Sequence, residues 1–223
     1  MNSSRTTSDK RGLSTPPALP VVYIVDDDVS VRESLELLVR NENWQPVTFA
    51  SAPGFLNHPR PLISSCLILD LSLPGLNGLE LQKQLAAERV DMPIIFITGH
   101  GDVPKTVQAM KAGALEFLTK PIDSETLVSA IRNALQRRSL SLAQDAEMQE
   151  LRARYSSLTS RQQQVMALVV SGLLNKQIGG ELGISEITVK AHRGQVMQKM
   201  KADSLATLVK LAAKLHTAQA SAA

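Results

Sequence analysis

The sequence has little cysteine, few aromatic residues and no long apolar segment. Its single cysteine, Cys66, excludes a disulfide framework and a zinc site of the usual spacing. No apolar segment approaches the roughly 18 residues that a membrane-spanning helix needs. Residues 1–19 are rich in Ser, Thr and Pro and do not resemble a secretory signal, so we predict a disordered tail there. These absences favour a cytoplasmic protein without membrane contact.

The net charge of +3 is unevenly distributed along the 223 residues. Residues 20–138 contain 11 Lys and Arg against 14 Asp and Glu, whereas residues 139–223 contain 10 against 6. An acidic part followed by a basic part is typical of a signalling domain joined to a nucleic-acid-binding domain. The length allows two domains of ordinary size.

Short, continuous apolar segments in the acidic part predict a parallel sheet. Such segments are typical of strands that are buried on both faces. They cover residues 21–25, 66–69, 94–97 and 115–118, and residues 44–49 predict a further strand near the sheet edge because they contain proline. Helical apolar patterns separate them, the first opened by a predicted capping box at residues 30–33. We therefore expect an α/β fold with a doubly wound, five-stranded parallel sheet.

A polar group follows or ends each central strand. Asp26 and Asp27 follow the first strand, Asp70 ends the third, Thr98 follows the fourth and Lys120 the fifth. In open α/β sheets functional groups gather beyond the carboxyl ends of the strands. Crowded carboxylates suit Mg²⁺, and a hydroxyl with a lysine suits the oxygens of a phosphoryl group. Asp70 would then be the nucleophile that accepts this group.

This ordered set resembles the receiver domain of two-component response regulators, and residues 98–105 resemble the FixJ-type subgroup. The resemblance implies that a sensor histidine kinase phosphorylates Asp70 and that Thr98 and Lys120 bind the phosphate. It implies a magnesium site made by Asp26, Asp27, Asp70 and the backbone carbonyl of Ser72.

Other residues near the proposed site follow from the same resemblance. Phe117, three residues before the lysine, has the position of the family's switch aromatic. The bond between Lys120 and Pro121 is expected to be cis. His100 is interpreted as a residue that controls water access, and Asp102 as the cap of the next helix.

The basic part predicts short helices with recognisable caps. Residues 159–162 form a capping box, Asn175 is the predicted cap of a helix over residues 176–182, and Ser185 caps one that runs to about Met200. Gly183 ends the middle helix, so the pair forms a helix-turn-helix. Residues 139–156 predict a helical linker, either paired with a second copy or solvated.

The helix after Ser185 has a polar, basic face, whereas we expect Ile187, Val189, Val196 and Met200 to point inward. In the major groove Arg and Lys read guanine and Gln reads adenine. The stretch 158–205 resembles the LuxR-type DNA-binding domain. The predicted DNA contacts are Lys176, Thr188, Lys190, Arg193, Gln195 and Lys199.

Together the resemblances imply a FixJ/NarL-type transcriptional regulator rather than an enzyme, apart from slow self-dephosphorylation. Its parts would be a receiver (20–138), a linker (139–156) and a DNA-binding domain (157–218). We expect phosphorylation to pair two chains on promoter DNA, with RNA polymerase as a further candidate partner. Two alternatives stay open: a phosphate sink that drains a kinase, and a DNA-binding protein with an inert receiver. An RNA-binding output is disfavoured because no aromatic residue follows Tyr155.

Overall fold

The computed structural model describes residues 19–99 and 103–220, which form two compact units that divide after Leu142. The predictions for the tail, except Leu19, and those for His100 and Asp102 lie outside the described residues. Among the helices of the described part, none is both long and apolar enough to cross a membrane.

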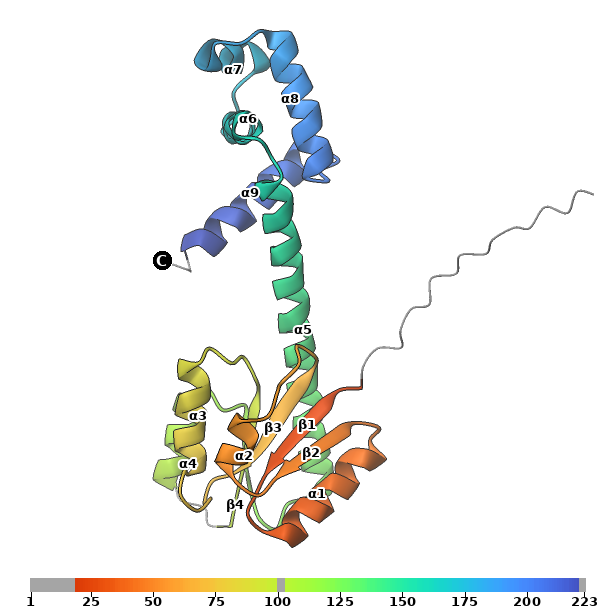
Figure 1. Cartoon of the computed structure of the whole chain (residues 1–223), viewed down its shortest axis with the longest axis vertical. Coiled ribbons are helices and arrows are strands. Elements are labelled where there is room, and N and C mark those ends of the chain that lie inside the picture. The colour runs from red at the N-terminus through yellow and green to blue at the C-terminus, as the bar shows by residue number, and fades with distance from the viewer. Residues whose placement is uncertain (1–18, 100–102, 221–223) are drawn as a thin grey trace, which may run out of the picture. The chain divides into compact units, whose positions relative to one another are not determined.

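The first unit contains a five-stranded parallel sheet, as predicted (Figure 1). Its strands are β1 (Val21–Val25), β2 (Gln45–Phe49), β3 (Ser65–Asp70), β4 (Ile94–Thr98) and β5 (Glu116–Thr119). Their spatial order is β2-β1-β3-β4-β5, and every neighbouring pair is parallel. The chain leaves β1 toward β2 on one side and returns to β3 on the other. In sheets of this topology functional groups gather at the carboxyl ends of the strands where the direction changes, here β1 and β3.

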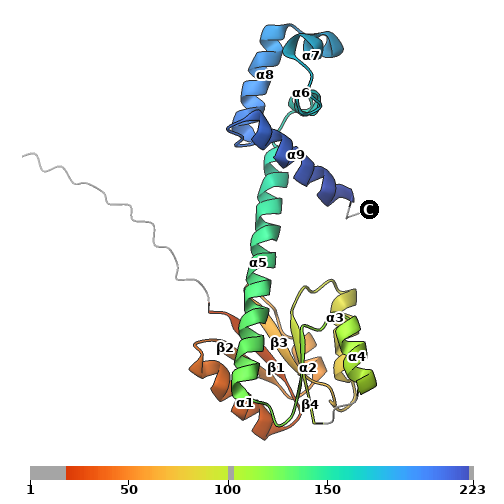
Figure 2. The same ribbon diagram turned by 180° about the vertical axis from the view of Figure 1, so that it is seen from behind.

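Helices cover both faces of this sheet, which explains why every residue of β1, β3 and β4 is buried (Figures 1 and 2). One core contains Phe55, Leu81 and Ala109 from α2 (Ala52–Leu56), α3 (Gly78–Ala87) and α4 (Val103–Lys111). The other contains Leu35 from α1 (Val29–Asn41) and Ile131 from α5 (Ser124–Ser156).

The capping box predicted at residues 30–33 is wrong. The cap of α1 is Asp28, whose carboxylate accepts hydrogen bonds from the N–H groups of Ser30 and Val31. The last residue of the acidic triplet thus satisfies the free amides at the helix start, and Ser30 becomes part of the first turn. Capping accounts for Asp28 and leaves Asp26 and Asp27 for another purpose.

The second unit is helical and includes the end of α5. Its other helices are α6 (Ser160–Val170), α7 (Asn175–Leu182), α8 (Glu186–Lys199) and α9 (Leu205–Ala220). Buried residues of all five helices make one core, namely Leu151, Val165, Ile178, Val189 and Leu208. Because Leu151 lies in the predicted linker and is buried in this core, that segment is neither wholly solvated nor simply a spacer.

Three predicted caps of the second unit are confirmed and one is wrong. Thr159 and Gln162 form the reciprocal capping box of α6, Ser185 caps α8, and Gly183 ends α7 with a left-handed φ of 63°. Asn175 is not a cap but the first residue of α7, after Leu174. Its side-chain oxygen accepts a hydrogen bond from Arg193 of α8 instead.

The turn of the helix-turn-helix requires one of its glycines. A Cβ added to Gly179 would lie 2.8 Å from the carbonyl oxygen of Ile184, closer than real Cβ atoms approach. The prediction that Ile187 points inward is wrong, because this side chain is 80% exposed. The helix turns its Val189 and Val196 side into the core, which leaves Ile187 on the opposite side.

Candidate functional site

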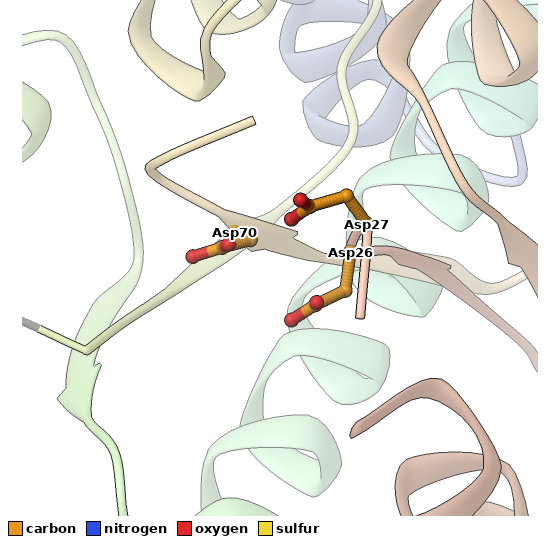
Figure 3. Close-up of side chains that lie close together, drawn as sticks. All are labelled: Asp26, Asp27 and Asp70. Atoms are coloured by element: carbon orange, nitrogen blue, oxygen red, sulfur yellow. The ribbon is translucent and has the colours of Figure 1, made fainter. Parts of the chain in front are cut away.

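Three carboxylates meet at the carboxyl ends of β1 and β3. Val25 pairs with Leu69 across these strands, so Asp26 and Asp70 follow at the same level of the sheet. One oxygen from each of Asp26, Asp27 and Asp70 lies within 4.8 Å of the others. Figure 3 shows the three side chains gathered at these strand ends. The predicted acidic cluster is present.

Lys120 reaches this cluster from the end of β5. Its Nζ lies 2.7 Å from Oδ2 of Asp26 and 3.7 Å from Oδ2 of Asp70. Its backbone N–H donates to the carbonyl oxygen of Thr98 at 2.7 Å, and its peptide bond to Pro121 is cis, as predicted. Thr98 is buried at the end of β4, one residue beyond the one that pairs with Asp70. The predicted residues therefore come from four strand ends and share one edge of the sheet.

Asp70 is held in an environment that disfavours its charge. The residue is 5% exposed, and burial is the main reason why the pKa of its carboxyl is raised. Lys120 lowers the pKa, Asp26 and Asp27 raise it, and a hydrogen bond from the backbone of Ser72 lowers it. Among the described residues, Oδ1 of Asp70 is buried without a hydrogen-bond partner. Such an atom costs free energy unless something else binds it.

Phe117 and Ser72 are the remaining residues that the sequence predicts for this site. The Phe117 ring is half-buried, and its centroid lies 6.3 Å from that of Phe96 in the core. Ser72 is exposed. The switch role of Phe117 and the ligand role of the Ser72 carbonyl stay predictions.

The residues predicted to contact DNA fall into two groups. Lys176, Thr188 and Lys190 are exposed, and Lys190 forms a 3.3 Å ion pair with Glu186 on its own helix. Arg193, Gln195 and Lys199 have partners inside the second unit. Arg193 donates to Asn175, and Gln195 accepts a hydrogen bond from the amide nitrogen of Gln162.

Gln162 also holds Lys199, a role that the sequence analysis missed. Nζ of Lys199 donates to Oε1 of Gln162 and to the carbonyl oxygen of Ser157, both at 2.9 Å. Gln162 is 4% exposed and joins the start of α6 to α8. The capping pattern identified Gln162, but its partners on α8 are more than thirty residues away in the chain.

Comparison with known proteins adds family information to this geometry. Residues 22–132 match the response regulator receiver domain, and residues 156–212 match the LuxR family of bacterial regulatory proteins. Nodulation protein W of Bradyrhizobium diazoefficiens is 45% identical over 204 residues, which cover 89% of this chain and 90% of that protein. The chain belongs to the response regulators with a LuxR-type DNA-binding domain. This confirms the family predicted from the two sets of motifs.

Members of the FixJ type are among its relatives. The transcriptional regulatory protein FixJ of Azorhizobium caulinodans is 43% identical, over 88% of this chain and 93% of its own. The solved structure of the response regulator StyR is 50% identical and covers 88% of this chain and all of that one, with a TM-score of 0.83. The assignment as a FixJ/NarL-type regulator is consistent with both.

The acidic cluster of this response regulator suits a hard cation. All its side-chain donors are carboxylate oxygens, which Mg²⁺ prefers and which Mg²⁺ binds while keeping several waters. Oδ1 of Asp70, which has no hydrogen-bond partner in the part of the chain that the structure describes, can bind such a cation. Lys120 lies 2.7 Å from Asp26 and 3.7 Å from Asp70, so this single cation is shared between two of the three carboxylates.

Proposed function

We propose that the protein is a transcriptional regulator whose DNA binding is controlled by phosphoryl transfer from a sensor histidine kinase to Asp70. The observation that carries this proposal is the Asp70 carboxylate, buried with one oxygen unpartnered, beside a lysine and two further carboxylates. A group in this position can act as a nucleophile because charge of both signs is already arranged around it.

The transfer moves one phosphoryl group between two side chains. The nitrogen–phosphorus bond of a kinase phosphohistidine breaks as an oxygen of Asp70 bonds to phosphorus, and the electron pair stays with the imidazole. Lys120 is 3.7 Å from Asp70 and would pair with the phosphoryl oxygens, to which the Thr98 hydroxyl would also donate. Bound through Asp26, Asp27, Asp70 and the Ser72 carbonyl, Mg²⁺ would neutralise negative charge there.

The output would follow from a change of partners for Lys120. In the unphosphorylated site this side chain forms its shortest ion pair with Asp26. A phosphoryl group on Asp70 would draw it away, and Thr98 and the half-buried Phe117 would adjust with it. We propose that the altered receiver surface pairs two chains, so that two α8 helices bind two half-sites of promoter DNA in the cytoplasm, with RNA polymerase as a downstream partner.

The test of this function is chemical labelling of the full chain. Acetyl phosphate with Mg²⁺ should label the protein and Asp145→Asn, an exposed control carboxylate, but not Asp70→Asn. Labelling should increase the apparent size of the protein and its recovery of specific sequences from random DNA. Persistent labelling of Asp70→Asn would refute the assignment of the phosphoacceptor.

The same experiment separates the two alternatives. Labelling without any sequence-selective DNA binding would favour a phosphate sink. Sequence-selective binding that is unchanged in Asp70→Asn would favour a DNA-binding protein with an inert receiver.

A further inference from the structure

One stripe of α8 begins with an apolar residue that the second unit does not bury. Ile187 is 80% exposed in the first turn after the cap Ser185, whereas Val189 and Val196 on the other side are buried. With 3.6 residues per turn, Ile187 shares its side of the helix with Ala191, Gly194 and Gln198. All four residues are exposed.

The middle of this stripe is unusually flat. Ala191 and Gly194 follow Ile187 by one and two turns. A Cβ added to Gly194 would meet no heavy atom of the described residues within 4 Å, unlike one added to Gly179. Glycine inside a helix costs about 1 kcal/mol relative to alanine. Packing within the unit therefore does not account for Gly194, whereas a partner that approaches the helix closely would.

The charge of the second unit favours DNA as this partner, since residues 139–223 contain 10 Lys and Arg against 6 Asp and Glu. Lys190, which pairs with Glu186, is exposed on one side of Ile187, and Thr188 and Gln195 are exposed on the other. A single isoleucine beside alanine, glycine and lysine is far smaller than the apolar patches of protein interfaces. The residues also lie in the segment that matches the LuxR family.

The major groove offers one apolar group on its base edges, the C5 methyl of thymine. We propose that Ile187 is a specificity-determining residue that packs on a thymine methyl in each half-site of the operator. Ala191 and Gly194 let the helix come close enough for this contact. The inference rests on the proposed DNA-binding function and adds to it the base pair that Ile187 selects.

The experiment removes the methyl group from the DNA and the side chain from the protein separately. DNA recovered by the acetyl-phosphate-treated full chain from a random library is resynthesised with single thymines replaced by deoxyuridine, which lacks only the C5 methyl. At one position per half-site the unaltered protein should lose about fourfold in affinity, the contribution of one buried methyl group. Ile187→Ala should bind the thymine DNA and the deoxyuridine DNA with equal affinity. This affinity should be no higher than the one that the unaltered protein has for the deoxyuridine DNA.

Two control variants test whether the preference for thymine depends specifically on Ile187. Val209→Ala truncates a partly exposed apolar residue of α9 and should keep the preference for thymine over uracil. Lys190→Ala should weaken binding to both DNAs by the same factor. Circular dichroism should show that Ile187→Ala keeps its helices.

The outcomes separate this inference from the function on which it rests. Sequence-selective binding without any thymine position that depends on Ile187 overturns the inference alone. A change in self-association of Ile187→Ala with an unchanged preference for thymine would make the residue a protein contact and also overturns it. Failure to bind any sequence selectively overturns the proposed function as well.

Discussion

Each unit contains a polar cluster around a buried side chain, Asp70 in the first and Gln162 in the second, and the two clusters are built in opposite ways. In the first unit, Asp26, Asp27 and Asp70 bring like charges together, and one oxygen of Asp70 has no partner among the described residues. In the second unit, the neutral side chain of Gln162 donates to Gln195 and accepts from Lys199. Within the described residues, the carboxylate cluster of the first unit therefore lacks a hydrogen-bond partner for one oxygen of Asp70, whereas the cluster around Gln162 forms a connected hydrogen-bond network.

This difference separates reactivity from stability. A buried carboxylate whose charge is disfavoured lowers the free energy of unfolding but stays available for a phosphoryl group or a cation. A buried amide with its hydrogen bonds formed holds two helices in one arrangement. Substitutions in the two clusters should therefore change stability in opposite directions.

The largest effect is expected at Gln162. The change Gln162→Ala leaves the Thr159 N–H and the Lys199 ammonium without the oxygen that accepts from both. It should lower the free energy of unfolding of the second unit by about 2–3 kcal/mol, because the buried Gln162 side chain loses its hydrogen bonds with Thr159, Gln195 and Lys199, each worth about 1 kcal/mol. Urea unfolding, monitored by hydrogen exchange of the amides in α6 and α8, would measure this loss of stability.

A neighbouring glutamine provides the control. Gln164 is exposed and its side chain accepts a hydrogen bond from Arg161 on its own helix, so Gln164→Ala should change stability by less than about 0.5 kcal/mol. Equal effects of the two substitutions would contradict the role of Gln162 as the link between α6 and α8.

Gln162 also limits what Gln195 can offer to DNA. A bidentate contact to adenine uses both the carbonyl and the amino group of a glutamine. One lone pair of the Gln195 carbonyl already accepts from Gln162, so a bidentate contact to adenine would compete with this hydrogen bond. On this arrangement Gln195 would donate to a phosphate or a base acceptor.

A smaller effect is expected at Gly78, which opens α3 behind the phosphoacceptor. A Cβ at this residue would lie 2.6 Å from the carbonyl oxygen of Asp70 and 3.0 Å from the Phe96 ring. The change Gly78→Ala should lower the stability of the first unit by about 1–3 kcal/mol through overpacking. It should also slow labelling of Asp70, because the end of β3 must shift.

Gly54 is the matched control because it also lies in a helix of the first unit. Its added Cβ would be 3.5 Å from the nearest atom, an ordinary contact. Gly54→Ala should leave labelling unchanged. If Gly78→Ala labelled at the rate of Gly54→Ala, the support of Asp70 by the start of α3 would be disproved.

The sheet and its acidic cluster could be predicted from sequence because of one geometric rule. A polar residue at the end of a continuous apolar strand has a defined place, since parallel strands share an edge. Asp70, Thr98 and Lys120 therefore converge although they are far apart in the chain.

Helix caps and the partners of surface side chains could not be predicted in the same way, because no comparable geometric rule fixes them. Asp28 and Ser30 are both good cap residues, and only the strand end decides which of them lies at the helix start. Isoleucine is usually buried in the core, but Ile187 lies on the exposed side of its helix. The partners of Arg193 and Lys199 come from α7, from α6 and from the end of α5, which local pattern does not reveal.

The smallest expected effect concerns the free energy of unfolding, which the buried charge of Asp70 lowers. The folded pKa of Asp70 lies above its ordinary value of 3.8, so the folded state binds the proton more tightly than the unfolded state. The favourable contribution of the protonated carboxyl is present below the unfolded pKa and is lost as the pH rises through the folded pKa. At pH 7 without Mg²⁺, Asp70→Asn should therefore be more stable than the natural sequence, by about 1 kcal/mol.

The pH dependence makes this prediction specific to the charge. The advantage of Asp70→Asn should shrink as the pH falls through the raised pKa of Asp70, where the natural carboxyl takes up its proton, and Asp145→Asn should show no such change. The stability of the first unit can be measured by urea unfolding in the presence of a metal chelator. Fluorescence of Trp44, the only tryptophan of the sequence, monitors this unfolding. An advantage that did not vary with pH would mean that packing, and not the buried charge, distinguishes the phosphoacceptor cluster from the one around Gln162.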